Sequence, residues 1–414
     1  MKPTSMMPFD EAKALLSHAI QAVQDTELRP VAQAVGFTLA MPAQAPIALP
    51  LADQSAMDGF ALASQGTTPA GARFKVVGTA WAGTPWQGTL APGEAARIMT
   101  GAWVPQGANR VVIQEDVQPL EDSHIELLEA CPEGANIRPR GDDVQQGQTV
   151  LAAGQRLQVA DCCLLQALGM SKVTVIRPLR VAILATGDEL KVPGETLVPG
   201  AIYESNRLAI TQMLAPHPVH LTDLGIVPDQ PEQLRQVLAH ASTQYDLIIS
   251  TGGVSVGAAD YTRSVLAELG SVEFWKVAIK PGKPVAFGRL GNALFFGLPG
   301  NPVSAIVTAH QLLLPALAQL AGQVYPEPTP LSAQLTAPLR KRPGRMEWQR
   351  VQLRAEPNDQ GRWQHWAQPI SGQGSHMLWS LSQANAYCIL PAEQGDLETH
   401  DWVHVVPFDA ALWR

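Results

Sequence analysis

A short apolar run that leads directly into a glycine-rich turn constrains the fold of this chain more than any other feature. Residues 245–251 (YDLIIST) have the length and apolar character of a buried parallel strand. The turn that follows (GGVSVG) lets backbone N–H groups approach an anion, because glycine places no Cβ in the way. Ligands of open α/β sheets bind at the carboxyl ends of strands, so the turn predicts ligand contacts from Gly252, Gly253, Ser255 and Gly257. A purely structural strand-to-helix turn has the same composition.

Two other predicted strands end in comparable turns. The residues at these ends are Gly187, Asp188 and Glu189 after residues 180–186, and Pro299, Gly300, Asn301, Pro302 and Ser304 after residues 292–298. Asn301 is placed to cap the apolar helix that follows, and Pro302 suits its first turn. We expect the three turns to surround one cleft, at the point where the order of the parallel strands reverses.

Three lysines lie on or just beyond a fourth candidate strand. If residues 274–280 form one strand, Lys276 and Lys280 project from the same face, because alternate side chains of a strand share a face. Lys283 lies just past the next turn. Most lysines are solvated surface residues, which is the alternative interpretation. Three lysines beside glycine turns in an otherwise acidic chain favour a phosphate site.

The composition excludes several classes of protein. The chain has 414 residues, of which 46% are hydrophobic and 16% charged, so it is long enough for several domains and is not of disordered composition. Its formal net charge of −8 argues against a general nucleic-acid binder, since duplex binding needs a basic face. The N-terminus lacks a signal-peptide core, and polar residues and Pro315 interrupt the longest apolar stretch, residues 305–321. The four cysteines show no C-x-x-C spacing, so we expect a reduced, cytoplasmic protein without a membrane span.

The sequence pattern divides the chain into three unlike parts. Residues 1–175 form a helical and β-rich lobe, with helices predicted over 9–25 and 160–170 around short β runs. Residues 176–325 alternate strands with helices, predicted over 204–214, 231–241, 261–269 and 302–320, which is typical of a doubly wound α/β sheet. Residues 326–414 hold strand-like runs that predict a small β-barrel or sandwich. The expected fold class is a multidomain α/β protein.

Nine motifs occur in an order that resembles one known family. They are SAMDGF (residues 55–60), RIMTGA (97–102), IRPRGDDV (137–144), ATGDEL (185–190), IYESN (202–206), STGGVSVGAADY (250–261), FWKVAIKPGKP (274–284), GLPGNPVSA (297–305) and GQGSHML (372–378). Together they span nearly the whole chain and resemble the MoeA / gephyrin E-domain proteins, the molybdopterin molybdenumtransferases of molybdenum-cofactor synthesis. Phe60 departs from the tyrosine of many family members.

The resemblance implies a reaction and a metal. Family members receive adenylylated molybdopterin from a partner adenylyltransferase, insert molybdenum from molybdate, cleave the phosphoanhydride and release AMP, with Mg²⁺ or another divalent ion. The implied metal ligands are Asp188, Glu189, Asp229 and Asp260, and the implied catalytic residues of this region are Glu189, Asp229, Asp260, Lys276 and Lys280. Mg²⁺ takes one or two carboxylates and keeps several waters, which fits this set. Asp229 and Asp260 are equally well placed as helix caps.

The resemblance also implies an oxyanion site in the C-terminal part. Arg345, Arg350 and Ser375 match family positions near the site of metal insertion. Molybdate is a dianion, and the planar donor fork of arginine suits an oxyanion. Without the resemblance, ordinary charges at the edge of a strand would be the simpler interpretation.

Three residues of the N-terminal lobe match catalytic positions of the family: Asp58, Thr100 and Asp143. Family members are elongated homodimers whose N-terminal lobe reaches toward the partner's active site. The loop that carries Asp58 is therefore expected to act on the cleft of a second copy. Asp-Gly is also a strong turn former, so the loop is equally consistent with a structural turn.

Three other functions share some of these features. Pterin adenylyl transfer uses the same α/β domain, but the additional segments before residue 175 and after residue 330 favour metal insertion. A receptor scaffold is expected to carry a long linker or a fused second enzyme domain, and this sequence shows neither. A pterin carrier without turnover would have the same binding residues, and AMP release would distinguish it.

Overall fold

The computed structural model describes residues 6–253, 260–357, 360–409 and 412. The chain forms two compact units. Leu28–Val35 and Leu39–Thr174 form one unit, which we call the β-rich lobe. Met1–Glu27, Gly36–Thr38 and Val175–Arg414 form the other, which we call the main unit. The main unit contains a central α/β domain and a C-terminal β domain.

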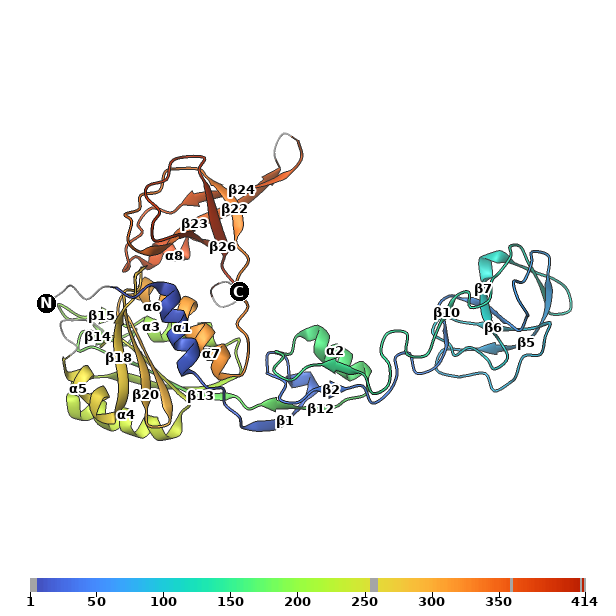
Figure 1. Cartoon of the computed structure of the whole chain (residues 1–414), viewed down its shortest axis with the longest axis horizontal. Coiled ribbons are helices and arrows are strands. Elements are labelled where there is room, and N and C mark those ends of the chain that lie inside the picture. The colour runs from blue at the N-terminus through green and yellow to red at the C-terminus, as the bar shows by residue number, and fades with distance from the viewer. Residues whose placement is uncertain (1–5, 254–259, 358–359, 410–411, 413–414) are drawn as a thin grey trace. The chain divides into compact units, whose positions relative to one another are not determined.

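The central domain is built on a six-stranded mixed sheet with the order β16-β13-β17-β21-β20-β18. Figure 1 labels β13, β18 and β20 of this sheet. Its strands are β13 (Leu179–Thr186), β16 (Val219–Val227), β17 (Leu247–Thr251), β18 (Gly270–Lys276), β20 (Pro284–Leu290) and β21 (Ala293–Leu298). The first four strands in this order are parallel, and β20 runs antiparallel to both of its neighbours. The chain passes from β13 to β16 on one side and from β17 to β18 on the other. The strand order therefore reverses between β13 and β17, which is where open α/β sheets bind ligands.

Helices cover both faces of this sheet, as the sequence predicted. One face packs against α1 (Phe9–Ala19), α3 (Asn206–Leu214), α6 (Pro302–Thr308) and α7 (Leu314–Leu320), and the other against α4 (Pro231–Gln244) and α5 (Asp260–Leu269). Successive residues of β13 alternate between the two cores, with Val181 in one and Ala182 in the other, both fully buried. Burial on both faces explains why the strand reads as a continuous apolar run.

The long apolar stretch of the sequence is a helix in this core. One π-helical turn (Ala309–Leu313) joins α6 to α7, so that Pro302–Leu320 is continuous helix. By length and composition it could cross a membrane, but 83% of its apolar window is buried inside the protein. That burial is the environment of a core helix.

Helix α1 is shorter than the sequence predicted and packs in the core of the main unit. The prediction extended it from residue 9 to 25, whereas it ends at Ala19. Beyond the helix, the N–H of Val23 donates to the carbonyl of Leu320 at 2.9 Å. This long-range bond takes the backbone out of helical pairing, and sequence periodicity carries no information about it.

The expectation of one strand through Lys276 and Lys280 is wrong. β18 ends at Lys276, and the N–H of Ile279 then donates to the carbonyl of Val277 at 2.9 Å, a tight turn centred on Ala278. The next strand, β19 (Ile279–Lys280), pairs with the C-terminal domain instead of the central sheet. Val277 and Ile279 are both fully buried, so their predicted burial is correct, although the two residues do not lie on one strand.

The C-terminal domain is a small barrel, as predicted. Its strands have the order β19-β23-β24-β22-β26-β25, and a further pairing between β23 and β25 closes five of them into a ring. The elements are β22 (Leu331–Leu335), β23 (Met346–Pro357), β24 (Trp363–Pro369), β25 (Ala386–Leu390), β26 (Trp402–Pro407) and α8 (Leu378–Ser382). Pairing of β19 with β23 joins this barrel to the central domain.

The β-rich lobe contains a six-stranded sheet with the order β7-β4-β6-β5-β9-β8. These strands are β4 (Gly59–Leu62), β5 (Arg73–Ala80), β6 (Glu94–Ile98), β7 (Arg110–Ile113), β8 (Val117–Pro119) and β9 (His124–Leu127). Two-stranded sheets β1-β12, β10-β3, β11-β2 and, in the main unit, β14-β15 complete the β structure. Their bounds, with the remaining helices, are β1 (Thr26–Pro30), β2 (Ala43–Gln44), β3 (Gln54–Ser55), β10 (Ile137–Arg138), β11 (Thr149–Leu151), β12 (Lys172–Ile176), β14 (Leu190–Lys191), β15 (Ile202–Tyr203), α2 (Val159–Ala167), and the 3-10 helices Val31–Gln33 and Gln114–Asp116.

Candidate functional site

Three strand-end turns lie side by side at one edge of the central sheet. Ala185 of β13 is in register with Thr251 of β17, which is in register with Leu298 of β21. The N–H of Gly252 donates to the carbonyl of Leu298 at 3.1 Å. A Cβ atom on Gly300 would lie 3.8 Å from the Cα of Gly252, so the two turns are in van der Waals range. The expected common edge is therefore present.

Close backbone contact explains the glycines at the start of the central turn. Gly252 has a φ of +87°, and a Cβ there would lie 2.5 Å from the carbonyl oxygen of Thr186. Gly253 has a φ of +67°, and its Cβ would lie 2.9 Å from the Thr186 hydroxyl. That hydroxyl is buried and has no hydrogen-bond partner among the described residues. Ser255 and Gly257 lie outside the described residues.

Three of the four predicted metal ligands gather at the ends of β13 and β16. The backbone N–H of Asp229 donates to Oδ1 of Asp188 at 3.1 Å. Burial raises the pKa of Asp229, and the neighbouring charges of Asp188 and Glu189 raise it further. In the described ranges no group of three or more His, Cys, Asp or Glu could hold a metal ion. The fourth residue, Asp260, is the first residue of α5, and its side chain lies outside the described structure.

The turn after β21 is held by a side chain that sequence reasoning left without a role. Nδ2 of Asn206, at the start of α3, donates to the carbonyl of Gly300 at 2.8 Å. Gly300 and Asn301 are exposed, whereas Pro299 and Ser304 are buried. Asn301 occupies the N-cap position of α6 and Pro302 its first position, as predicted, although the described part of the chain shows no capping bond from the Asn301 side chain. Asn206 belongs to the IYESN motif, which was the only signal for it.

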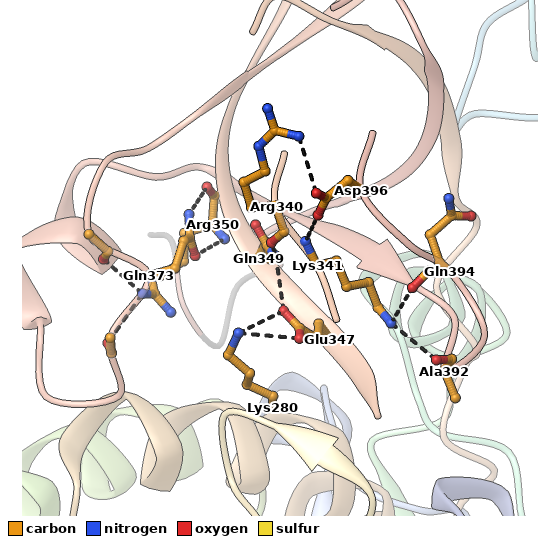
Figure 2. Close-up of polar contacts among 12 residues, drawn as sticks. Lys280, Arg340, Lys341, Glu347, Gln349, Arg350, Gln373, Ala392, Gln394 and Asp396 are labelled. Carbon is orange, nitrogen blue, oxygen red and sulfur yellow. Dashed lines mark hydrogen bonds and ion pairs between the residues drawn. The ribbon is translucent and has the colours of Figure 1, made fainter. Parts of the chain in front are cut away.

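Lys280 reaches from β19 to a carboxylate on the C-terminal barrel (Figure 2). Its Nζ lies 3.2 Å from Oε1 and 3.1 Å from Oε2 of Glu347. Lys276, at the end of β18, is half-buried, and Lys283 is exposed. Arg345 is half-buried and directly precedes β23, the strand with which β19 pairs. Lys280 is thus the predicted lysine for which the described residues show a contact between the central domain and the barrel.

Arg350 is built into the barrel wall (Figure 2). It is 0% exposed, its Nε donates to the Ser380 hydroxyl at 2.9 Å, and its Nη2 donates to the carbonyls of Gly372 and Gly374 at 3.0 and 3.2 Å. The remaining nitrogen, Nη1, has no partner within the described ranges. In this structure Arg350 thus supports a loop and presents no donor to solvent. Its direct contact with molybdate stays a prediction.

The loop that Arg350 holds also contacts the central domain. The carbonyl of Ser375, in this loop, accepts a bond from the N–H of Val303 at 3.0 Å. Val303 is the second residue of α6, the helix that follows the turn after β21. Ser375 therefore lies beside the start of α6, directly after the turn that follows β21, although about 70 residues of sequence separate them.

Asp58 and Thr100 meet in the β-rich lobe. Oδ1 of Asp58 accepts bonds from the backbone N–H and the hydroxyl of Thr100, at 2.7 and 2.8 Å. These two bonds lower the pKa of Asp58, with a smaller contribution from Arg97. Asp143 is exposed, and its N–H donates to the carbonyl of Leu49 at 3.0 Å. The lobe therefore presents an ionised carboxylate that a neighbouring residue holds in place.

Comparison with known proteins assigns the chain to a family. The MoeA N-terminal region (domain I and II) matches residues 7–169, a probable molybdopterin binding domain matches residues 182–319, and the MoeA C-terminal region (domain IV) matches residues 332–408. A molybdopterin molybdenumtransferase of Haemophilus influenzae is 38% identical over 408 residues, which cover 98% of this chain and 100% of the relative. The chain belongs to the MoeA family.

Other MoeA relatives agree with this assignment. Molybdopterin molybdenumtransferase 2 of Mycobacterium tuberculosis is 35% identical over 377 residues, covering 88% of this chain and 90% of the relative. A crystal structure of the molybdopterin biosynthesis MoeA protein from Pyrococcus horikoshii OT3 superposes with a TM-score of 0.82 at 28% identity, covering 98% of this chain and 100% of that one. The predicted family, fold class and enzyme class, and a role in molybdenum-cofactor biosynthesis, are confirmed.

Proposed function

We propose that this chain inserts molybdenum from molybdate into adenylylated molybdopterin, cleaves the phosphoanhydride and releases AMP. One observation carries the proposal: two glycine-containing turns and a carboxylate pair share the edge of the sheet where strand order reverses. We further propose that it acts in the cytoplasm as a homodimer and receives its substrate in a transient contact with the adenylyltransferase. In such a dimer the Asp58–Thr100 pair serves the cleft of the second copy.

The chemistry of each residue of the proposed site indicates its role. The Gly252–Gly253 turn offers backbone N–H groups to the phosphate groups, while the places of its missing Cβ atoms face Thr186 of the neighbouring strand. Lys276 and Lys280 supply positive charge where negative charge develops as the anhydride breaks. Arg345 directly precedes β23 and Ser375 contacts the start of α6, and both are proposed to orient the molybdate substrate.

We propose Mg²⁺ as the cofactor of this site. Burial raises the pKa of Asp229, and the charges of Asp188 and Glu189 raise it further; a cation beside these carboxylates would relieve their mutual repulsion. The described residues supply only part of a ligand shell, which fits an ion that binds through one or two carboxylates, waters and substrate phosphates. One or two of the carboxylates of Asp188, Glu189 and Asp229 would hold the ion, which would neutralise charge on the phosphate oxygens.

The decisive experiment is incubation of the purified chain with adenylylated molybdopterin, molybdate and Mg²⁺, with AMP release as the readout. Release that requires both molybdate and the divalent ion is the expected result, and a chain that binds the nucleotide without releasing AMP would be a carrier. The Lys276→Ala variant is expected to release AMP about 10²-fold more slowly, because it loses charge stabilisation in the transition state. Lys172→Ala, which removes an exposed lysine of β12, is the matched control. Near wild-type release by Lys276→Ala would move the phosphate site elsewhere.

A further inference from the structure

We propose that Glu347, on strand β23 of the barrel, is a positioning residue for Lys280. The inference rests on the proposed function, in which Lys280 binds the anionic substrate. It assigns to the C-terminal domain a task beyond contact with molybdate, because the barrel then sets the place of a catalytic lysine of the central domain. Backbone pairing, burial and the geometry of the ion pair support it independently.

Backbone pairing places the two side chains together. β19 and β23 are parallel, with Ile279 opposite Met346 and Lys280 opposite Glu347. Both carboxylate oxygens lie within 3.2 Å of Nζ, so the ammonium group faces the carboxylate along its two-oxygen edge (Figure 2). A charged hydrogen bond to each oxygen restricts the long lysine side chain far more than a single exposed contact would.

The two members of the pair differ sharply in exposure. The side chain of Glu347 is 2% exposed, whereas that of Lys280 is 40% exposed. A buried carboxylate is costly unless it is paired and hydrogen-bonded, so the buried member has few alternative positions. Lys280, the exposed member, is therefore bound at its ammonium group to a carboxylate that has few alternative positions.

A polar cluster within the barrel fixes Glu347 in turn (Figure 2). Nε2 of Gln349 donates to Oε2 of Glu347 at 2.9 Å and to the carbonyl of Arg340 at 3.1 Å. Lys341 is 4% exposed, and its Nζ donates to the carbonyls of Ala392 and Gln394 at 3.2 and 2.9 Å. Burial lowers the pKa of Lys341, while the charge of Glu347 raises it, so the two groups sense one another. The carboxylate is therefore held from the side opposite Lys280.

This arrangement leaves Lys280 ready to bind an anion. An ammonium group has three N–H donors, and Glu347 takes two of them. The third donor remains for the substrate, and the Lys280 side chain is 40% exposed. Since fixing a long lysine side chain costs rotamer entropy, an ammonium group that is held in advance binds an anion with less further entropy loss.

The test is a double-mutant cycle on AMP release. Glu347→Gln keeps the shape of the side chain and a partner for Gln349 but removes the charge that holds Lys280. We expect a fall in kcat/KM of about tenfold for Glu347→Gln, a larger fall for Lys280→Ala, and no further fall when the two changes are combined. Glu398→Gln, which removes a barrel carboxylate that is 69% exposed, is the matched control and should be unchanged.

A second readout does not depend on activity. With lysine labelled with ¹³C at Cε, the Lys280 resonance is assigned by its loss in Lys280→Ala. It should report restricted motion in the unsubstituted protein and faster motion in Glu347→Gln. If AMP release is absent but Glu347→Gln increases the motion that the Lys280 resonance reports, the proposed function fails and the positioning contact stands.

Two results would overturn the inference. One is an Lys280 resonance that Glu347→Gln leaves unchanged. The other is additivity, in which Glu347→Gln lowers kcat/KM by the same factor with and without Lys280. If Glu347→Gln does not fold, Glu347→Asp enters the same cycle, because it keeps the charge but withdraws it from Nζ by one methylene group.

Discussion

The ion cluster at the start of the central sheet allows a quantitative prediction of stability. Asp246 precedes β17 and accepts bonds from Nη1 and Nη2 of Arg177 at 2.7 and 3.0 Å, and from the N–H and Nη2 of Arg180 at 2.7 and 3.0 Å. Its side chain is 10% exposed. Burial alone would raise the pKa of Asp246, but the bonds from Arg177 and Arg180 outweigh it and lower the pKa from 3.8 to about 2.

This pKa converts to a stabilising free energy with a defined pH dependence. A pKa lowered from 3.8 to about 2 corresponds to about 2 kcal/mol of folding stability at neutral pH. Because the folded pKa is below the unfolded one, the stabilisation is complete above roughly pH 4 and is lost as the pH falls through about 2. Asp246→Asn is isosteric and should remove about 2 kcal/mol at pH 7 and roughly 1 kcal/mol at pH 3.

Amide hydrogen exchange, read by mass spectrometry on peptides that cover β13 and β17, measures this loss within the central domain. Exchange in a chain of several domains is more informative than one unfolding midpoint, because the domains need not unfold together. Asp25→Asn is the control: Asp25 also pairs with Arg177, at 3.0 Å, but it is 72% exposed, so its removal should cost well under about 1 kcal/mol. Equal effects of the two substitutions, or an Asp246→Asn effect that does not shrink toward low pH, would refute the reasoning.

Three further predictions concern the cleft and the lobe. Gly253→Ala should destabilise the central domain by more than the roughly 1–2 kcal/mol that a left-handed alanine costs, because its Cβ would lie 2.9 Å from the Thr186 hydroxyl. Gly66→Ala is the control, because Gly66 has a φ of +57° and open space around its Cβ position, so that only the backbone cost is expected. Equal shifts in hydrogen exchange for the two variants would contradict this reasoning. In Thr100→Val the pKa of Asp58 should rise but stay below its ordinary value, since the backbone bond from residue 100 remains, and NMR titration of the carboxyl carbon would show it. Light scattering should give the mass of a homodimer, and a monomer would remove the proposed role of the lobe in trans.

Several features of the site could be predicted from local sequence alone. The apolar run of β17 and the glycines after it predicted a buried strand and a close backbone turn, and the structure has both. These predictions succeeded because strand burial and positive φ leave direct compositional signals. The ordered motifs predicted the family, which the comparisons confirm.

Contacts between distant segments could not be predicted in this way. Periodicity placed Lys276 and Lys280 on one strand, because it reports which residues are buried and not which sheet buries them. Arg350 was expected to contact molybdate or to be an ordinary charge at a strand edge, but the loop that contains Gly372 and Gly374, together with Ser380 of α8, covers its side chain completely.

The partner of Lys280 separates what the sequence determines from what only the tertiary structure decides. The sequence by itself determined the character of each strand, the glycine turns and the membership of the family, since these depend on neighbouring residues or on motif order. Only the tertiary structure decided that β19 leaves the central sheet to pair with β23, and that a glutamate 67 residues away lies against Lys280. The physical reason is that the sequence around Lys280 carries no signal for the residue that pairs with it. In the folded chain, however, the buried carboxylate of Glu347 requires a counter-charge.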